Sequence, residues 1–167
     1  MAFANVLAKL PPKFLNKVIE VDTFLKSLRP LKFRRTVEKD NKKITYISSD
    51  YGISYAITIS GTEVSHHFGW YYLRNKEEKI WFRKTDYFVE TLTEIAQTNP
   101  SSAERIFNSI NKCSSCKGNP CSAISYLYSG QRQLACYGRI ILPISHEGFD
   151  DALLFFKNLN NLVEHKL

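Results

Sequence analysis

The sequence has no long run of apolar residues, and this absence excludes a membrane-spanning helix. No stretch of the 167 residues approaches the roughly 20 consecutive apolar residues that such a helix needs. The first residues, MAFANVLAKLPPKF, also lack the order of a secretory signal, because no basic segment precedes the apolar run and Lys9 ends it early. We therefore expect a cytoplasmic protein with no membrane partner.

Catalytic motifs and signs of division into domains are also missing. The chain holds no nucleophile elbow, phosphate-binding loop or HExxH pattern. It has no internal repeat, no low-complexity run and no linker rich in Gly, Ser or Pro. With 44% hydrophobic and 23% charged residues, its composition is that of an ordinary globular protein. We expect residues 1–167 to form one domain, and enzymatic activity, although open, is not favoured.

Hydrophobic periodicity in the first half of the chain predicts a helix followed by a β-meander. Apolar residues recur every three or four positions over 14–28, between Pro11-Pro12 and Pro30, which predicts a helix. Over 32–84 the period changes to two, and short turn sequences separate the runs, which predicts about five antiparallel strands. These predicted strands are KFRRTV, KITYIS, ISYAITI, EVSHHFGWYYLR and KIWFRK.

The second half of the chain predicts helices around one hairpin. The segment DYFVETLTEIAQ predicts a helix, and Ser101 or Ser102 can cap a second helix that delivers Cys113 at its end. Two strands flank the turn Ser129-Gly130, and residues 148–166 form an amphipathic closing helix. The fold class is thus α+β, with an antiparallel sheet packed against N-terminal, middle and C-terminal helices.

Cysteine is scarce, yet three of the four cysteines lie within the nine residues CSSCKGNPC. The spacing C-x2-C-x4-C-x14-C is typical of structural zinc sites, and the turn at Lys117-Gly118 resembles a zinc knuckle. Four thiolates fill every position of a tetrahedral ion, which argues for a structural and against a catalytic metal. The sequence therefore predicts a Cys-rich metal staple at 113–136 that binds one zinc through Cys113, Cys116, Cys121 and Cys136.

Three other interpretations of the cysteines stay open. They are four unrelated reduced thiols, a redox dithiol at Cys113 and Cys116, and an iron–sulfur cluster. The redox interpretation is weaker than the zinc interpretation because a reactive C-x-x-C normally begins a helix, whereas Cys113 is expected to follow one.

An aromatic stretch, HHFGWYY at 66–72, is the second candidate site. Its side chains alternate between the two faces of a strand, and Ile80-Trp81-Phe82 follows on the next strand. A strand apolar on both faces is usually central and covered by helices, so we expect these rings to belong mainly to the core. The alternative is a ligand pocket, because aromatic walls with a few polar tips suit planar or cationic ligands. The candidate ligand-binding residues are His66, Trp70, Tyr72 and Trp81.

The net charge of +7 comes almost entirely from the first fifty residues, which hold eleven Lys and Arg against five Asp and Glu. The densest part, residues 26–43, could bind nucleic acid, with Trp70, Tyr71 or Trp81 available for base stacking. The alternative is a solvated helix end and hairpin rim.

Three classes of function remain. The sequence favours a non-catalytic module that binds a small molecule or a protein and is stabilised by zinc. Nucleic-acid binding is a less favoured alternative. A further alternative is a small enzyme with His66 or His67 as a base and Asp50 or Glu63 as its partner.

Overall fold

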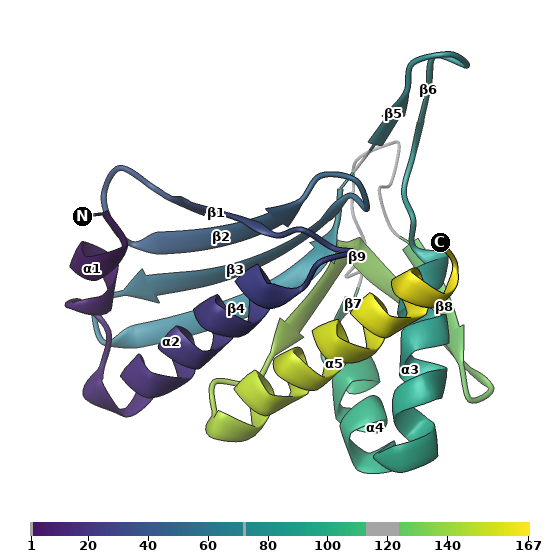
Figure 1. The fold of residues 1–167 in the computed structure, drawn as a ribbon. Coiled ribbons are helices and arrows are strands. Elements are labelled where there is room, and N and C mark those ends of the chain that lie inside the picture. Colours follow the sequence, from purple (N-terminus) through teal and green to yellow (C-terminus); the bar gives the residue numbers. More distant parts are fainter. Residues whose placement is uncertain (1, 72, 113–123) are drawn as a thin grey trace, which may run out of the picture.

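The computed structural model describes residues 2–71, 73–112 and 124–167 and has the predicted α+β architecture (Figure 1). Seven strands form one antiparallel sheet in the order β1-β2-β3-β4-β9-β7, with β8 paired to β9. Strands β5 and β6 pair with each other in a separate ribbon. The strands are β1 Arg34–Val37, β2 Lys43–Ser48, β3 Ile53–Ser60, β4 Glu63–Trp70, β5 Leu73–Asn75, β6 Ile80–Phe82, β7 Ile110–Lys112, β8 Ile124–Tyr128 and β9 Gln131–Leu142. The helices are α1 Ala2–Leu7, α2 Pro12–Ser27, α3 Asp86–Thr98, α4 Pro100–Asn108 and α5 His146–His165.

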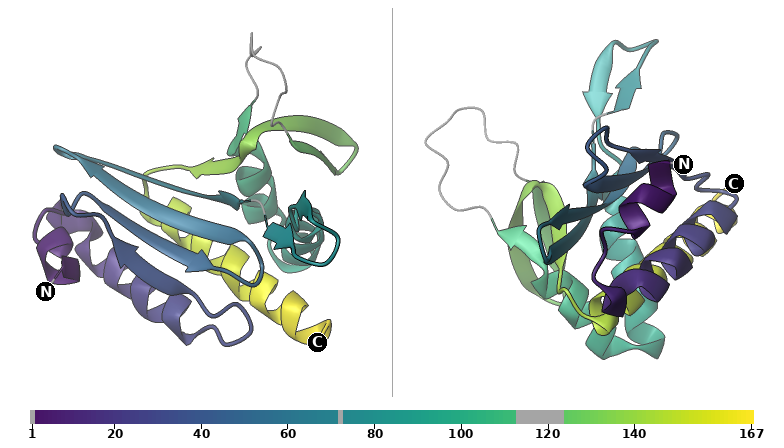
Figure 2. Two further views of the ribbon diagram at one scale, coloured as in Figure 1. Left: turned by 90° about the horizontal axis from the view of Figure 1, so that it is seen from above. Right: turned by 90° about the vertical axis from the view of Figure 1, so that its left-hand side faces the viewer.

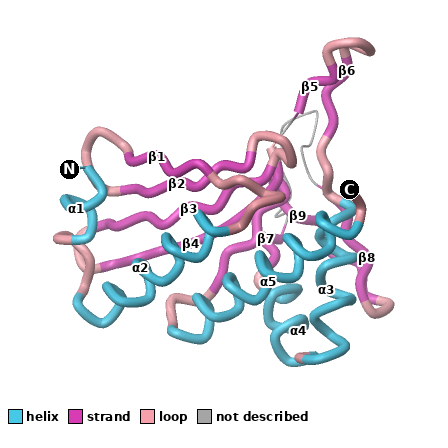
Figure 3. Tube along the Cα trace, in the orientation of Figure 1, coloured by secondary structure: helices cyan, strands magenta, loops and turns pink. Residues whose placement is uncertain are grey.

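Strands β1 to β4 form a meander whose alternation matches the sequence. The register pairs Ile44 with Ile57 and Tyr55 with Phe68, so that the apolar residues of successive strands share one face. Strand β9 then pairs with β4 and extends the sheet with a strand from the far end of the chain. The colouring by secondary structure in Figure 3 shows this sheet as a continuous layer beside the helices.

Helices α2 and α5 lie side by side across one face of the sheet, and α3 and α4 lie beyond α5, towards β8 (Figures 1 and 2). The longer helices are amphipathic; α5, for example, buries Phe149, Phe155 and Phe156 while most of its polar residues face solvent. No described helix covers the opposite face of β1 to β4. That opposite surface, made by the outward residues of β1–β4 and the end of β9, is called the helix-free face below.

The core between sheet and helices is built mainly from aromatic rings. Phe68 stacks on Phe155 with ring centroids 4.4 Å apart, and Trp70 meets Phe88 and Phe155 edge-on. All four rings are buried. The high aromatic content of the chain therefore serves this interior, where each ring removes a large apolar area from water.

Four details differ from the sequence-based predictions. The predicted fifth meander strand does not join the large sheet, because β6 pairs with β5, the continuation of the predicted fourth strand. Helix α4 is capped by Asn99, whose side chain accepts a hydrogen bond from the Ser102 amide, and not by Ser101 or Ser102. The short N-terminal helix α1 was not predicted. Cys113 follows strand β7 and not a helix, since α4 ends at Asn108.

Candidate binding site on the helix-free face

The pleat of the strands selects which side chains reach the helix-free face. Because side chains alternate along a strand, the residues between the core positions of β2, β3 and β4 point away from the helices. The register aligns them in two rows that cross the sheet. One row is Thr36, Thr45, Ala56, His67 and Ile141; the other is Arg34, Ile47, Ser54, Gly69 and Arg139.

Small residues at the centre of these rows leave a hollow in the face. A cavity of 320 Å³ lies over β2, β3, β4 and β9. Thr45, Ser54, Ala56 and Gly69 contribute its short lining groups. Its longer lining side chains are Lys43, His67, Tyr71, Arg83 and Arg139. The volume lies at the lower end of the range of small-molecule sites.

The charge of this cavity is positive. Lys43, Arg83 and Arg139 line it, whereas its described lining contains no Asp or Glu. Lys43 forms an ion pair of 3.0 Å with Glu38, whose side chain is 53% exposed. Such an exposed pair contributes little, so Glu38 neutralises Lys43 only weakly. The cavity is therefore arranged to receive negative charge.

The pKa of His67 is affected by this environment. Its pKa is lowered first by burial and then by the positive charges of Arg139 and Lys43. Both causes disfavour the imidazolium form, one by removing water and the other by repulsion. His67 is therefore neutral at pH 7, and the charges of Arg139 and Lys43 both act on it.

Tyr71 and Arg83 join the cavity to the β5–β6 ribbon (residues 73–82), because they lie just before and just after it in the chain. The Tyr71 amide donates to the Gly52 carbonyl at 2.7 Å, which fixes the ribbon base against the β2–β3 turn. Gly52 has φ +63°, and a Cβ there would lie 2.8 Å from Leu73 Cγ. This close approach requires glycine at the turn.

The predicted ligand residues lie elsewhere. His66 and Trp70 point to the helix-covered face, where they are 0% and 3% exposed. Trp70 borders the cavity, but its ring packs on Phe68 and Phe88 in the core. These buried positions agree with the core interpretation of the aromatic stretch, and β4 presents the neighbouring His67, not His66, to the cavity. Tyr72 lies outside the described residues, and of Trp81 the structure describes only the backbone, in β6.

The proposed pairing of His66 with a carboxylate is not formed. His66 Nε2 contacts the Pro143 carbonyl oxygen and its Nδ1 contacts the Tyr55 hydroxyl, both at 2.8 Å. A carbonyl oxygen only accepts, so Nε2 carries the proton and Nδ1 accepts from Tyr55. His66 is thus held by core partners and not by the carboxylate of Asp50 or Glu63.

The predicted metal ligands lie mostly outside the described residues. Cys113, Cys116 and Cys121 belong to the segment 113–123, and only the backbone of Cys136 is described, within β9. Among the residues that the structure does describe, no cluster of three or more His, Cys, Asp or Glu could hold a metal. The two ends of the segment are described: Lys112 and Ile124 both pair with Ala135, the residue before Cys136.

The basic stretch 26–43 does not form one surface. Lys26 and Arg35 both bind Asp22 on the helix-covered side, at 3.2 and 2.8 Å. Arg34 and Lys43 face the opposite side, where Arg83 and Arg139 from later segments join Lys43 in the cavity. Counting charges along the sequence missed this grouping, since only the sheet register brings β2 and β9 together.

Searches against protein-family models, curated proteins and solved structures found no match for this chain. Within the described ranges, no helix has the length and apolar character needed to cross a membrane.

Proposed function

We propose that this protein is a non-catalytic binding module that holds an anionic ligand in the cavity of its helix-free face. The observation that carries the proposal is the lining itself: Lys43, Arg83 and Arg139 surround a small-residue floor, with no carboxylate among the described lining residues. Ligands with phosphate or carboxylate groups fit this chemistry, because guanidinium groups bind such anions in a two-point geometry.

The physical basis is relief of repulsion. Burial lowers the pKa of His67 most, and the positive charges of Arg139 and Lys43 lower it further. A bound anion removes this repulsion and adds charge-assisted hydrogen bonds, which are roughly twice as strong as neutral ones. The floor of Ser54, Ala56 and Gly69 leaves room for the ligand to approach the backbone.

The same lining favours binding over catalysis. Acid–base catalysis needs a group that exchanges protons near neutral pH, usually with a partner that orients it. Burial raises the pKa of Tyr71, whose hydroxyl donates to the Ser48 carbonyl at 3.2 Å. His67 is thereby the one ordinary acid–base candidate among the described lining residues, and Lys43 and Arg139 oppose its protonation.

The first test is calorimetric titration with inorganic pyrophosphate and citrate. Replacing Lys43 or Arg139 with Gln should weaken binding by about tenfold or more, equivalent to about 1.4 kcal/mol. The matched control is Lys157→Gln, a surface lysine on α5, on the opposite side of the molecule. Unaltered binding in both cavity variants, or no binding of either anion by the wild type, would remove the proposal.

The second test uses the pH dependence. An anion favours protonated His67, so its pKa, lowered in the free protein, should rise in the complex, and pyrophosphate affinity should increase as pH falls. The His67→Gln variant should lose this increase. NMR titration of the imidazole in the free and bound protein measures the shift directly, and an equal or lower pKa in the complex contradicts the assignment.

We further propose that the four cysteines bind one structural zinc ion. Support comes from the ends of the cysteine-bearing segment: Lys112 in β7 and Ile124 in β8 pair with the same residue, Ala135. They therefore lie on opposite edges of β9, each one strand spacing from the residue next to Cys136. Cys113 directly follows Lys112, which fits a metal that joins β7, β8 and β9.

A further inference from the structure

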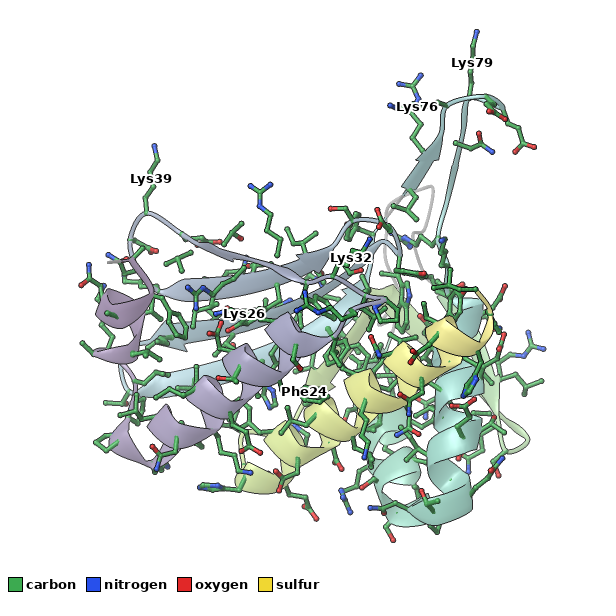
Figure 4. All side chains as sticks on the ribbon, viewed as in Figure 1. Phe24, Lys26, Lys32, Lys39, Lys76 and Lys79 are labelled. Carbon is green, nitrogen blue, oxygen red and sulfur yellow. The ribbon has the colours of Figure 1, made fainter. Side chains whose placement is uncertain are left out.

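The β5–β6 ribbon stands away from the body of the protein (Figures 1 and 3). It pairs only with itself among the described strands, with Leu73 opposite Phe82 and Asn75 opposite Ile80. An isolated two-stranded ribbon is marginally stable in water. Figure 4 shows Lys76 and Lys79 reaching outward from its tip, and both are exposed. The ribbon begins and ends at the cationic cavity, through Tyr71 and Arg83.

Charge is divided between the layers of the molecule. The five helices carry ten acidic residues and five Lys or Arg. The seven strands of the large sheet carry a single acidic residue, Glu63, and six basic ones. Residues 73–84, the ribbon and the two residues after it, add five Lys or Arg against Glu77 and Glu78. The sheet and ribbon therefore present positive potential, whereas the helical layer opposes it.

We propose that this surface binds duplex DNA, with the β5–β6 ribbon in the major groove and the helix-free face on the neighbouring phosphates. The inference rests on the proposed anion site and identifies the anion as the DNA backbone. The major groove is about 12 Å wide and admits a two-stranded β-ribbon. Lys76 and Lys79 supply exposed hydrogen-bond donors on that ribbon, whereas the Asn75 amide donates to Glu78 at 3.0 Å.

The dimensions of the face suit a duplex. Arg34 and Arg139 end a row that crosses four strand spacings, about 19 Å at about 4.8 Å each. This length spans about half a helical turn of DNA, with a phosphate every 3.4 Å along each strand. Lys43 and Arg83 line the cavity on the same face.

Two features favour duplex DNA over other nucleic acids. Modules for single strands stack bases on exposed aromatic rings, whereas the two rows of the helix-free face consist mainly of Thr, Ser, Ala, Gly, Ile and Arg, with His67 as their one ring. The ring of Tyr71 beside them is held by a hydrogen bond from its hydroxyl to the Ser48 carbonyl. Double-stranded RNA has a deep, narrow major groove that side chains cannot read. A protruding ribbon beside a cationic face therefore fits B-form DNA best.

The test is fluorescence anisotropy with a 30-base-pair DNA duplex, one of its single strands, and a duplex RNA of the same sequence. We expect the DNA duplex to bind most tightly, with log K falling against log salt with a slope of about −4 to −5, as for four to six phosphate contacts. Single-stranded DNA or duplex RNA binding as tightly as duplex DNA would overturn the proposal. So would equal binding of polyglutamate at the same salt, which would assign the surface to an acidic protein.

Variants separate this inference from the proposed anion site. Replacing Lys76 and Lys79 together with Ser should weaken duplex binding by about tenfold while pyrophosphate binding stays unchanged. Lys43→Gln should weaken both, and Lys157→Gln neither. If the wild-type protein binds pyrophosphate but not duplex DNA, the DNA assignment alone is refuted. If the wild-type protein binds neither, the proposed anion site is refuted as well. Undiminished duplex affinity in the double ribbon variant also overturns the proposal.

Discussion

His66 shows how one buried residue can determine the acid response of the fold. Its ring stacks on Phe149 at 4.2 Å and bridges Tyr55 in β3 to the Pro143 carbonyl at the start of the last connection. Gly148 makes this arrangement possible, since a Cβ there would collide with that same carbonyl oxygen. The imidazole therefore fastens β4 to the N-terminus of α5 in its neutral form.

Acid should destabilise the protein through this group. Burial lowers the pKa of His66 to about 4, against about 6.5 in the unfolded chain. Between these two pKa values the unfolded state binds more protons than the folded state. The contribution of His66 to the free energy of unfolding is therefore fully present above pH 6.5 and is lost as pH falls to 4, a decrease of about 3 kcal/mol. Urea unfolding at several pH values measures the loss. A His66→Gln variant should lack it, and equal pH dependence in both proteins would contradict the assignment.

Helices and strands in which apolar residues recur at a regular spacing could be predicted from the sequence. Very short elements could not. The helix over 14–28 corresponds to α2, and KITYIS coincides with β2, because apolar spacing there reflects one buried face. Strand β7, only three residues long, carries no period of its own and exists through pairing with β9. The ribbon was mistaken for a sheet strand because its sequence alternates in the same way.

The candidate site could be predicted only in part, because its position depends on which face of β4 the helices cover. The sequence correctly separates His66 from His67 onto opposite faces but does not say which face is open. Arg139 reaches the cavity through a pairing with Gly69 that spans seventy residues of sequence. Alternation of small residues at Ser54 and Ala56 was the available signal for a hollow face.

The core position of Trp70 gives a prediction at the level of its strand. Trp70→Ala removes a ring that contacts Phe68, Phe88 and Phe155, so it should reduce the free energy of unfolding by about 3 to 5 kcal/mol. The control is Leu127→Ala on β8, where the side chain is 54% exposed and the expected loss is below about 0.5 kcal/mol. Urea denaturation of both variants, with an unchanged m-value, measures the two free energies of unfolding. A decrease in the Trp70 variant no larger than in the control would place the ring outside the core.

At the scale of the whole molecule, two halves of the sheet depend on different stabilising elements. Strands β1 to β4 rest on α2 and α5 through a continuous aromatic and aliphatic core. Strands β7 and β8 are short and meet the rest of the sheet through β9 alone. A metal that joins these three strands would add cohesion where two of them are short and connect to the sheet through one neighbour.

Metal removal should therefore affect the two halves unequally. Protein purified without chelator should contain about one zinc per chain, with zinc–sulfur distances near 2.3 Å by X-ray absorption. After chelation, amides of β7, β8 and β9 should exchange with solvent faster, while those of β2 and β3 keep their protection, because the proposed ligands flank only the former. Cys136→Ser should reproduce the chelated pattern.

Three other outcomes would contradict the proposed zinc site or its local role. Four thiols that react freely in protein never exposed to chelator, with no bound metal, would show that the cysteines are unrelated. A coloured sample with bound iron would replace zinc with an iron–sulfur cluster. If amides of β2, β3 and β9 all lost their protection from hydrogen exchange equally after chelation, the metal would stabilise the whole fold. Local opening confined to β7, β8 and β9 could not expose the amides of the meander.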